Sequence, residues 1–193
     1  MRPAIACLLA LSLISASAEE PKKWFKGNTH THSLWSDGND FPEMITDWYK
    51  QRGYDFLAIS DHNVLQAKEV WVGVPTVEKK RKALGKPTME KYLARFGKDW
   101  VTTRDKDGVT EVRLKKLEEY RPLLEEPGKF LLVQAEEISA GIGKQPIHLG
   151  AVNLQEEIKP IKDLANAQEV LRANFKMVNE QSERLGIPMF THI

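Results

Sequence analysis

The histidines of this chain all lie in, or directly after, segments whose sequences predict β-strands, and none lies in a predicted helix. Histidines scattered over a protein surface would not be placed so selectively, so we interpret them as one functional group. The fold therefore has to supply a strand for each of these positions. The residues are His30, His32, His62, His148 and His192.

Strand and helix signals alternate along the chain, which predicts an α/β architecture. One helix has a clear beginning, because Asp40 can cap it, Pro42 lies in its first turn and Glu43 completes a capping box. Gly53 ends it. Its apolar residues follow the helical period and predict one apolar face: Phe41, Met44, Ile45, Trp48 and Tyr49. Strands are predicted over 24–31, 56–59, 130–133, 147–152 and 188–193, and a long helix over 165–185.

Residues 66–128 form a long charged segment that interrupts this alternation and resembles an insertion. Within it we expect a helix over 88–96, a hairpin of strands 100–104 and 109–114 around Asp107 and Gly108, and a helix over 115–126. The run of acids from Asp105 lacks the spacing of a calcium loop, so a turn is the favoured interpretation.

The triplet His30-Thr31-His32 is the sharpest chemical feature of the sequence. In a strand, residues i and i+2 point to the same face, about 6.6 Å apart along the chain. Two imidazoles placed in this way can bind one metal ion or two adjacent ions. Asp37 follows in a Ser-Asp-Gly loop, from which its carboxylate is able to fold back onto the same ion.

A second carboxylate and imidazole, Asp61 and His62, come directly after the predicted strand 56–59. An apolar strand does not usually end in Asp-His unless these groups have a function. The alternative is a capped turn with an ordinary surface histidine, and the His-x-His and Ser-Asp-Gly motifs make that alternative less favoured.

Glu136 and Glu137 extend the strand that is predicted from residue 130. Neighbouring strand residues face opposite ways, so only one of these acids is expected to face the site. His148 lies in the next strand, after a glycine-containing loop at 139–143 that we expect to be flexible. That loop and Lys144 are a weak candidate for contact with a phosphate and are more simply a connection.

Four runs of the sequence, in this order, resemble the successive motifs of the PHP (polymerase and histidinol phosphatase) superfamily: GNTHTHSLWSDG, AISDHN, QAEEIS and IHLG. The resemblance covers most of 19–193 except 66–128. It implies a distorted (β/α)₇ barrel with two or three metal ions at the carboxyl ends of its strands, where barrel active sites lie. The family's late Asp-x-His motif is absent and the chain ends inside a predicted strand, so we expect a domain that is truncated at the C-terminus.

The resemblance also implies roles for individual residues. Glu137 matches a glutamate that bridges metal ions, Asp61 matches a residue that orients His62 or lies behind it, and these three residues are the expected catalytic group. His192 stands where the family commonly has His-Pro, and a ligand and an ordinary strand histidine are equally favoured there. The implied metal ligands are His30, His32, Asp37, His62, Glu137 and His148.

Cysteine and charge limit the cofactors and partners. Cys7 is the only cysteine and lies in the N-terminal segment that we expect to be removed, so a metal has to be held by His, Asp and Glu. Zinc, manganese and iron all suit such ligands. The formal net charge of +1 gives no electrostatic reason to expect a nucleic acid or an anionic membrane as partner. The sequence does not indicate an oligomeric state.

Together these features predict a metal-dependent hydrolase of a small phosphorylated substrate, in which water activated by the ions attacks phosphorus. Two alternatives stay open. An amidohydrolase-like enzyme also begins with His-x-His, although the Ser-Asp-Gly and Ser-Asp-His motifs argue against it. A metal-binding module with the same fold but without turnover is the other.

The N-terminal segment has the features of a secretory signal peptide. Arg2 supplies a positive charge, residues 5–14 form an apolar run too short to span a bilayer, and Ala-Ser-Ala at 16–18 suits cleavage. We therefore expect a signal peptide over 1–18, export to the periplasm or the medium, and no membrane span after cleavage.

Mass spectrometry of protein recovered from the exported fraction of expressing cells should show a mature N-terminus at Glu19, because cleavage is expected after Ala18. An intact Met1 in that fraction would contradict the prediction.

Overall fold

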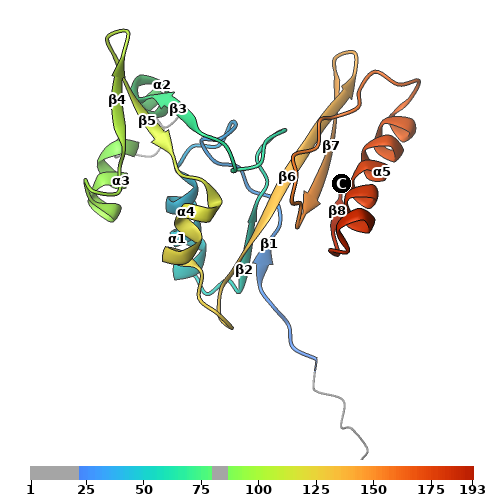
Figure 1. Cartoon of the computed structure of the whole chain (residues 1–193), viewed down its shortest axis with the longest axis horizontal. Helices are drawn as coiled ribbons and strands as arrows, with labels where there is room; N and C mark the ends of the chain where they lie inside the picture. The colour runs from blue at the N-terminus through green and yellow to red at the C-terminus, as the bar shows by residue number, and fades with distance from the viewer. Residues whose placement is uncertain (1–21, 80–86) are drawn as a thin grey trace, which may run out of the picture.

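The main sheet has five strands in the order β1-β2-β6-β7-β8 (Figure 1). The computed structural model describes residues 22–79 and 87–193, so the segment 1–18 lies outside the described residues. Strands β1, β2 and β6 run parallel, and β7 runs antiparallel to both β6 and β8. Their bounds are β1 (Gly27–Asn28), β2 (Phe56–Ile59), β6 (Leu131–Ile142), β7 (Gln145–Val152) and β8 (Phe190–His192).

A smaller antiparallel sheet belongs to the segment 66–128, with the order β3-β5-β4. The predicted hairpin is confirmed, since β4 and β5 are joined through Asp107 and Gly108, both at positive φ. Strand β3 and helix α2 were not predicted. The bounds are β3 (Val70–Gly73), α2 (Val74–Lys79), α3 (Thr88–Phe96), β4 (Thr103–Lys106), β5 (Val109–Leu114) and α4 (Leu117–Leu124).

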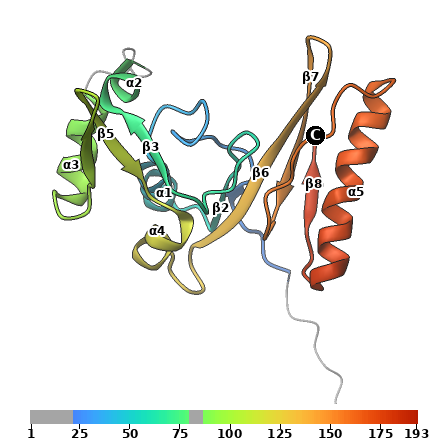
Figure 2. The ribbon, with the colours of Figure 1, turned by 45° about the horizontal axis from the view of Figure 1, so that its top comes forward.

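Two helices flank the main sheet. Helix α1 (Pro42–Gln51) contacts β2 and α4, and helix α5 (Ala167–Leu185) lies along β6, β7 and β8 (Figure 2). Asn166 caps α5 by accepting a hydrogen bond from the Glu169 backbone N–H, and Gly186 ends it in the left-handed conformation. No helix within residues 22–79 and 87–193 is long and apolar enough to cross a membrane.

The (β/α)₇ barrel that the family resemblance implied is wrong. In such a barrel the strands are all parallel and are joined by helical crossovers. Here β6 turns directly into β7 through Gly143, whose φ is +56°, and the two strands pair antiparallel from Ala135 to Ile142. A tight turn can join only antiparallel strands, because a parallel partner needs a crossover of a dozen or more residues. The expected flexible loop at 139–143 is therefore mostly the paired end of this ribbon.

The sheet is curled, and this brings its first and last strands together. Nε2 of His192, in β8, lies 3.3 Å from the carbonyl oxygen of Thr29, which directly follows β1. Figures 1 and 2 show the ribbon of β6 and β7 leaning away from β2, with α5 beside it at the right of both views. The curl gathers the carboxyl ends of β1 and β2 against the middle of β6.

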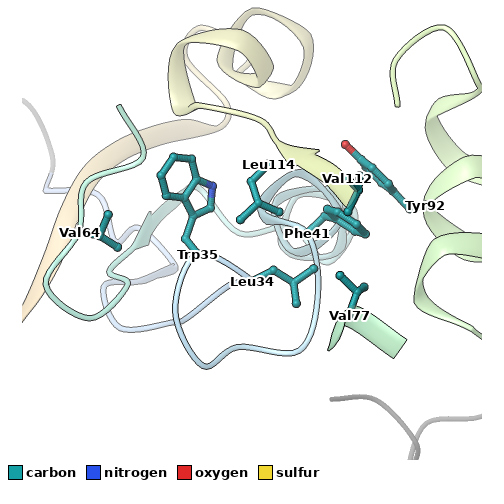
Figure 3. Packing of buried hydrophobic residues seen from close by; sticks show 8 residues of the cluster. All are labelled: Leu34, Trp35, Phe41, Val64, Val77, Tyr92, Val112 and Leu114. Carbon is teal, nitrogen blue, oxygen red and sulfur yellow. The ribbon is translucent and has the colours of Figure 1, made fainter. Parts of the chain in front are cut away.

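One hydrophobic cluster joins the loop after β1 to the segment 66–128 (Figure 3). The rings of Phe41 and Tyr92 stack with their centroids 3.8 Å apart, and the Trp35 indole donates a hydrogen bond of 3.2 Å to the carbonyl of Lys115. Each large side chain buried in this way contributes roughly 1.5–3 kcal/mol. The inserted segment therefore anchors the loop that carries Asp37. The buried members are Leu34, Trp35, Phe41, Val64, Val77, Tyr92, Val112 and Leu114.

The start of α1 differs from the predicted capping box. Phe41 is the N-cap residue, and no side chain caps the helix. Glu43 is fully buried instead, and its Oε1 accepts hydrogen bonds from the Tyr92 hydroxyl and, at 2.9 Å, from the Trp100 indole. Burial raises the pKa of Glu43 above its ordinary value, and this effect outweighs the two hydrogen bonds, which lower it. Packing against α3 has overridden the local capping preference.

Replacing Glu43 should change the pH dependence of stability. The folded protein holds the proton of Glu43 to a higher pH than the unfolded chain, so stability is fully present below the ordinary pKa and is lost as pH rises through the folded-state pKa. Urea unfolding of chelator-treated protein measures the free energy of unfolding at about pH 5 and about pH 8. The decrease in this free energy between the two pH values should be smaller for Glu43→Gln than for the wild type. The exposed Glu90→Gln should behave as the wild type; an identical pH dependence in Glu43→Gln would contradict the prediction.

Candidate metal centre

Glu137 is the centre of the predicted site, and four imidazoles surround its carboxylate. It lies where pairing between β2 and β6 ends, and an isolated parallel bridge links it to His62. Its side chain is only 3% exposed. The nearest distances to Oε2 are 2.7 Å from His32 Nε2, 3.0 Å from His62 Nδ1 and 3.3 Å from His30 Nε2, and His148 Nδ1 lies 2.6 Å from Oε1.

The two imidazoles of the His-x-His motif both reach Glu137. His30 and His32 both lie in the chain that directly follows β1, and both direct Nε2 toward Glu137 Oε2. The carbonyl of Thr31 accepts a hydrogen bond of 2.9 Å from the Ser60 backbone N–H, which continues the β1–β2 pairing. The backbone of this stretch is thereby held in register with β2.

Asp37 adds a second carboxylate beside the first. Its Oδ1 lies 2.8 Å from His32 Nδ1, and its Oδ2 lies 3.6 Å from His62 Nε2. Partial burial raises the pKa of Asp37, but the hydrogen bond with His32 and the charges of both imidazoles lower this pKa by a larger amount. The net result is a pKa below the ordinary value, so this carboxylate is available as an anionic ligand.

The electrostatics of Glu137 follow the same logic. Burial raises its pKa, but the hydrogen bond from His148 and the charges of His62, His30 and His148 outweigh burial and hold the pKa below its ordinary value. A buried ionised carboxylate is costly unless it is paired. The imidazoles, or a cation held between them, supply that pairing.

Glu136 faces the opposite side of β6, as alternation in a strand requires. It is fully buried, and its Oε2 accepts a hydrogen bond of 2.9 Å from the Ile158 backbone N–H. Burial raises the pKa of Glu136 to about 7. The two adjacent glutamates therefore have different environments, and only Glu137 contributes to the centre.

The donor atoms are grouped closely enough to hold a cation. His32 Nε2 and Glu137 Oε2 are both buried and, although 2.7 Å apart, form no hydrogen bond of acceptable geometry. Two atoms bound to one tetrahedral zinc ion at about 2.1 Å would lie roughly 3.4 Å apart, so these two atoms would have to move slightly apart to bind the same ion. Three groups of residues each have donor atoms that lie within 4.8 Å of one another. The groups are His30 with His32 and Glu137, His32 with Asp37 and His62, and His62 with Glu137 and His148. Each neighbouring pair of groups shares a residue, which suits a cluster of ions.

Asp61 takes no part in these groups and has a different task. Its buried carboxylate accepts four hydrogen bonds, two of them from the backbone N–H (2.7 Å) and hydroxyl (2.6 Å) of Ser33. Ser36 Oγ donates the third at 2.6 Å and Gln66 Nε2 the fourth at 2.9 Å. Asp61 therefore fixes the turn that leads into Asp37 and does not contact His62 through its side chain among the described contacts.

His192 lies beside the centre but belongs to none of the donor groups within the described residues. Its ring centroid is 5.6 Å from that of His30, and it packs directly over Gly150, where a Cβ atom would overlap the ring. The structure thus brings together six of the seven predicted ligands and leaves His192 adjacent to them.

Two residues without a predicted role support the centre. Ser139 Oγ lies 2.5 Å from His62 Nδ1. Asn63, at a left-handed φ of 51°, accepts a 2.8 Å hydrogen bond from the Ser139 backbone N–H and donates one of 3.2 Å to its carbonyl. Ser139 lies two residues after Glu137 in the same strand, so strand alternation gave a signal for it.

The sequence matches no protein-family model, and no curated protein matches it. The resemblance to the PHP superfamily therefore rests on the sequence motifs and stays a proposal.

Glu137→Gln should lower metal content more than any other conservative change, because it removes the anionic ligand that two donor groups share. Loss of a residue that only hydrogen-bonds to a metal ligand typically lowers metal affinity by roughly 10–100-fold. Glu137 would be a ligand itself, so its loss should lower the affinity by at least about 100-fold. His32→Ala, which also affects two groups, should lower the content too. Elemental analysis after dialysis against zinc or manganese measures it.

Glu136→Gln is the matched control, since it makes the same change at the neighbouring residue on the opposite face of β6. Equal metal content in Glu137→Gln and Glu136→Gln would show that the centre does not bind the ion as described.

Proposed function

We propose that this protein is a metal-dependent phosphoesterase related to the PHP superfamily, although it does not have the barrel that the family resemblance implied. The observation that supports it most is the buried, ionised Glu137 shared by four imidazoles, with Asp37 as a second anion. Two or three divalent ions, zinc, manganese or iron, suit these donors. When bound, such ions supply the positive charge that binds phosphoryl oxygens and makes water acidic enough to attack phosphorus.

The residues of the chain have separable tasks in this proposal. Glu137 and Asp37 provide negative charge, which the imidazoles alone lack, and so hold cations of higher charge. His30, with a side chain 48% exposed, and His148, with one 38% exposed, face the solvent side where a substrate arrives. His62 is held by Ser139, and Asp61 fixes the Asp37 turn, so both act by positioning.

Export is part of the proposal and rests on the sequence of residues 1–18 alone. An exported phosphoesterase would act on small phosphorylated compounds outside the cytoplasm. No observation favours an amidohydrolase or a binding module without turnover, and both are outcomes of the experiment below.

The experiment is a paired assay of metal-loaded and chelator-treated protein on phosphomonoesters, phosphodiesters and amides. We expect turnover of a phosphoester that requires the metal and falls at least about 100-fold in Glu137→Gln, because a loosely held ion stabilises the reacting phosphorus poorly. Glu136→Gln should retain activity. Turnover of amides alone would favour the amidohydrolase, and bound metal without turnover on any class would favour the binding module.

A further inference from the structure

Asp37 is held in place differently from the imidazoles of the metal centre. The backbone of Glu137 donates a 3.1 Å hydrogen bond to the carbonyl just before His62 and accepts one of 3.0 Å from the N–H just after it. The backbone beside His32 is bonded in a similar way to the residue after β2. Asp37 lies instead in the loop 33–37, which pairs with no strand in the described part of the chain. Its position therefore depends on the contacts that hold this loop.

The buried carboxylate of Asp61 holds the loop through both of its oxygens. Oδ1 accepts hydrogen bonds from the Ser33 N–H at 2.7 Å and from Ser36 Oγ at 2.6 Å, and Ser36 directly precedes Asp37. Oδ2 accepts hydrogen bonds from Ser33 Oγ at 2.6 Å and from Gln66 Nε2 at 2.9 Å. Gln66 is the partner that lies outside the loop, so it links the orientation of this carboxylate to the inserted segment.

Helix α4 of the inserted segment fixes Gln66 at two points. The Gln66 carbonyl accepts a 3.0 Å hydrogen bond from the N–H of Leu117, the first residue of α4. The Tyr120 hydroxyl donates one of 2.6 Å to Gln66 Oε1. In a side-chain amide the oxygen accepts and the nitrogen donates, so this bond turns Nε2 toward Asp61. Gln66 and Tyr120 are both buried, so water does not replace a hydrogen bond that is lost here.

We propose that Tyr120 and Gln66 are positioning residues for the metal ion that Asp37 binds, and that the inserted segment thereby sets the affinity of the centre for this one ion. Asp37 belongs to the donor group with His32 and His62 and to neither of the other two groups. The backbones of the imidazoles are held by strands of the main sheet, so the remaining ions keep their ligands when the loop loosens. This role rests on the metal centre of the proposed function, and not on turnover.

The test titrates chelator-treated protein with zinc, in competition with a coloured chelator, and so gives an affinity for each bound ion. Tyr120→Phe should lower one of these affinities about tenfold, because residues that orient a ligand change metal affinity by at least about this factor. The other affinities should stay within about twofold of the wild type. Unchanged affinities in Tyr120→Phe, or an equal loss for every ion, would overturn the proposal.

Tyr92→Phe is the matched control. It removes the hydroxyl of a tyrosine that is equally buried but donates its hydrogen bond to Glu43, so every zinc affinity should stay at the wild-type value. Gln66→Leu is the second variant, since it removes both side-chain hydrogen bonds of the link at once. It should lower the same affinity as Tyr120→Phe by at least as much, and a loss at a different ion would contradict the proposal.

A double-mutant cycle with Asp37→Asn separates positioning from a general loss of stability. If Tyr120 acts through Asp37, then Tyr120→Phe should lower the zinc affinity by less than about twofold once the Asp37 carboxylate is gone. Full additivity of the two changes would rule out a positioning role. Selective loss of one ion without hydrolysis of any ester would support this role and count against the phosphoesterase alone, whereas a wild-type protein that binds no ion would overturn both.

Discussion

The structure depends on the buried carboxylate of Glu137. An ionised group with so little access to water is unfavourable unless opposite charge and hydrogen bonds compensate it. The compensation comes from imidazoles after β1, after β2 and in β7, which are remote from one another in sequence. The curl of the sheet and the β6–β7 ribbon both bring these groups to one carboxylate. The centre therefore ties together three parts of the fold.

The inserted segment has a larger part in the centre than its composition suggests. The Tyr120 hydroxyl donates a 2.6 Å hydrogen bond to Gln66, whose amide donates to Asp61, which in turn accepts from Ser33 and Ser36. Each of these contacts is buried or half-buried, so it is little weakened by solvent. The position of Asp37 is thus set from two sides, by this chain of hydrogen bonds and by the packing of Leu34 and Trp35.

Much of the local structure follows from sequence patterns, because hydrophobic period and turn residues act over short distances. The strand 56–59 and the helix 88–96 have the predicted bounds, and the Asp107 turn is formed. The capping box of α1 and the flexible loop at 139–143 were wrong, because burial of Glu43 against Tyr92 and pairing of β6 with β7 are contacts between distant or newly paired segments. Tertiary contacts of this kind override local preferences.

The sequence by itself determined which side chains carry metal-binding groups, that His30 and His32 are two residues apart in one segment, and that only one of Glu136 and Glu137 faces them. The family resemblance already favoured Glu137 over Glu136, and the grouping of donor atoms in the tertiary structure places Glu137 among the imidazoles. Only the tertiary structure decided that Asp61 supports a turn, that His192 lies beside the donor groups, and that the sheet is mixed and curled. The physical reason is the distance along the chain over which each interaction acts. Side-chain direction along a strand is fixed by backbone geometry within two residues, whereas strand direction and convergence of ligands depend on which distant segments pair.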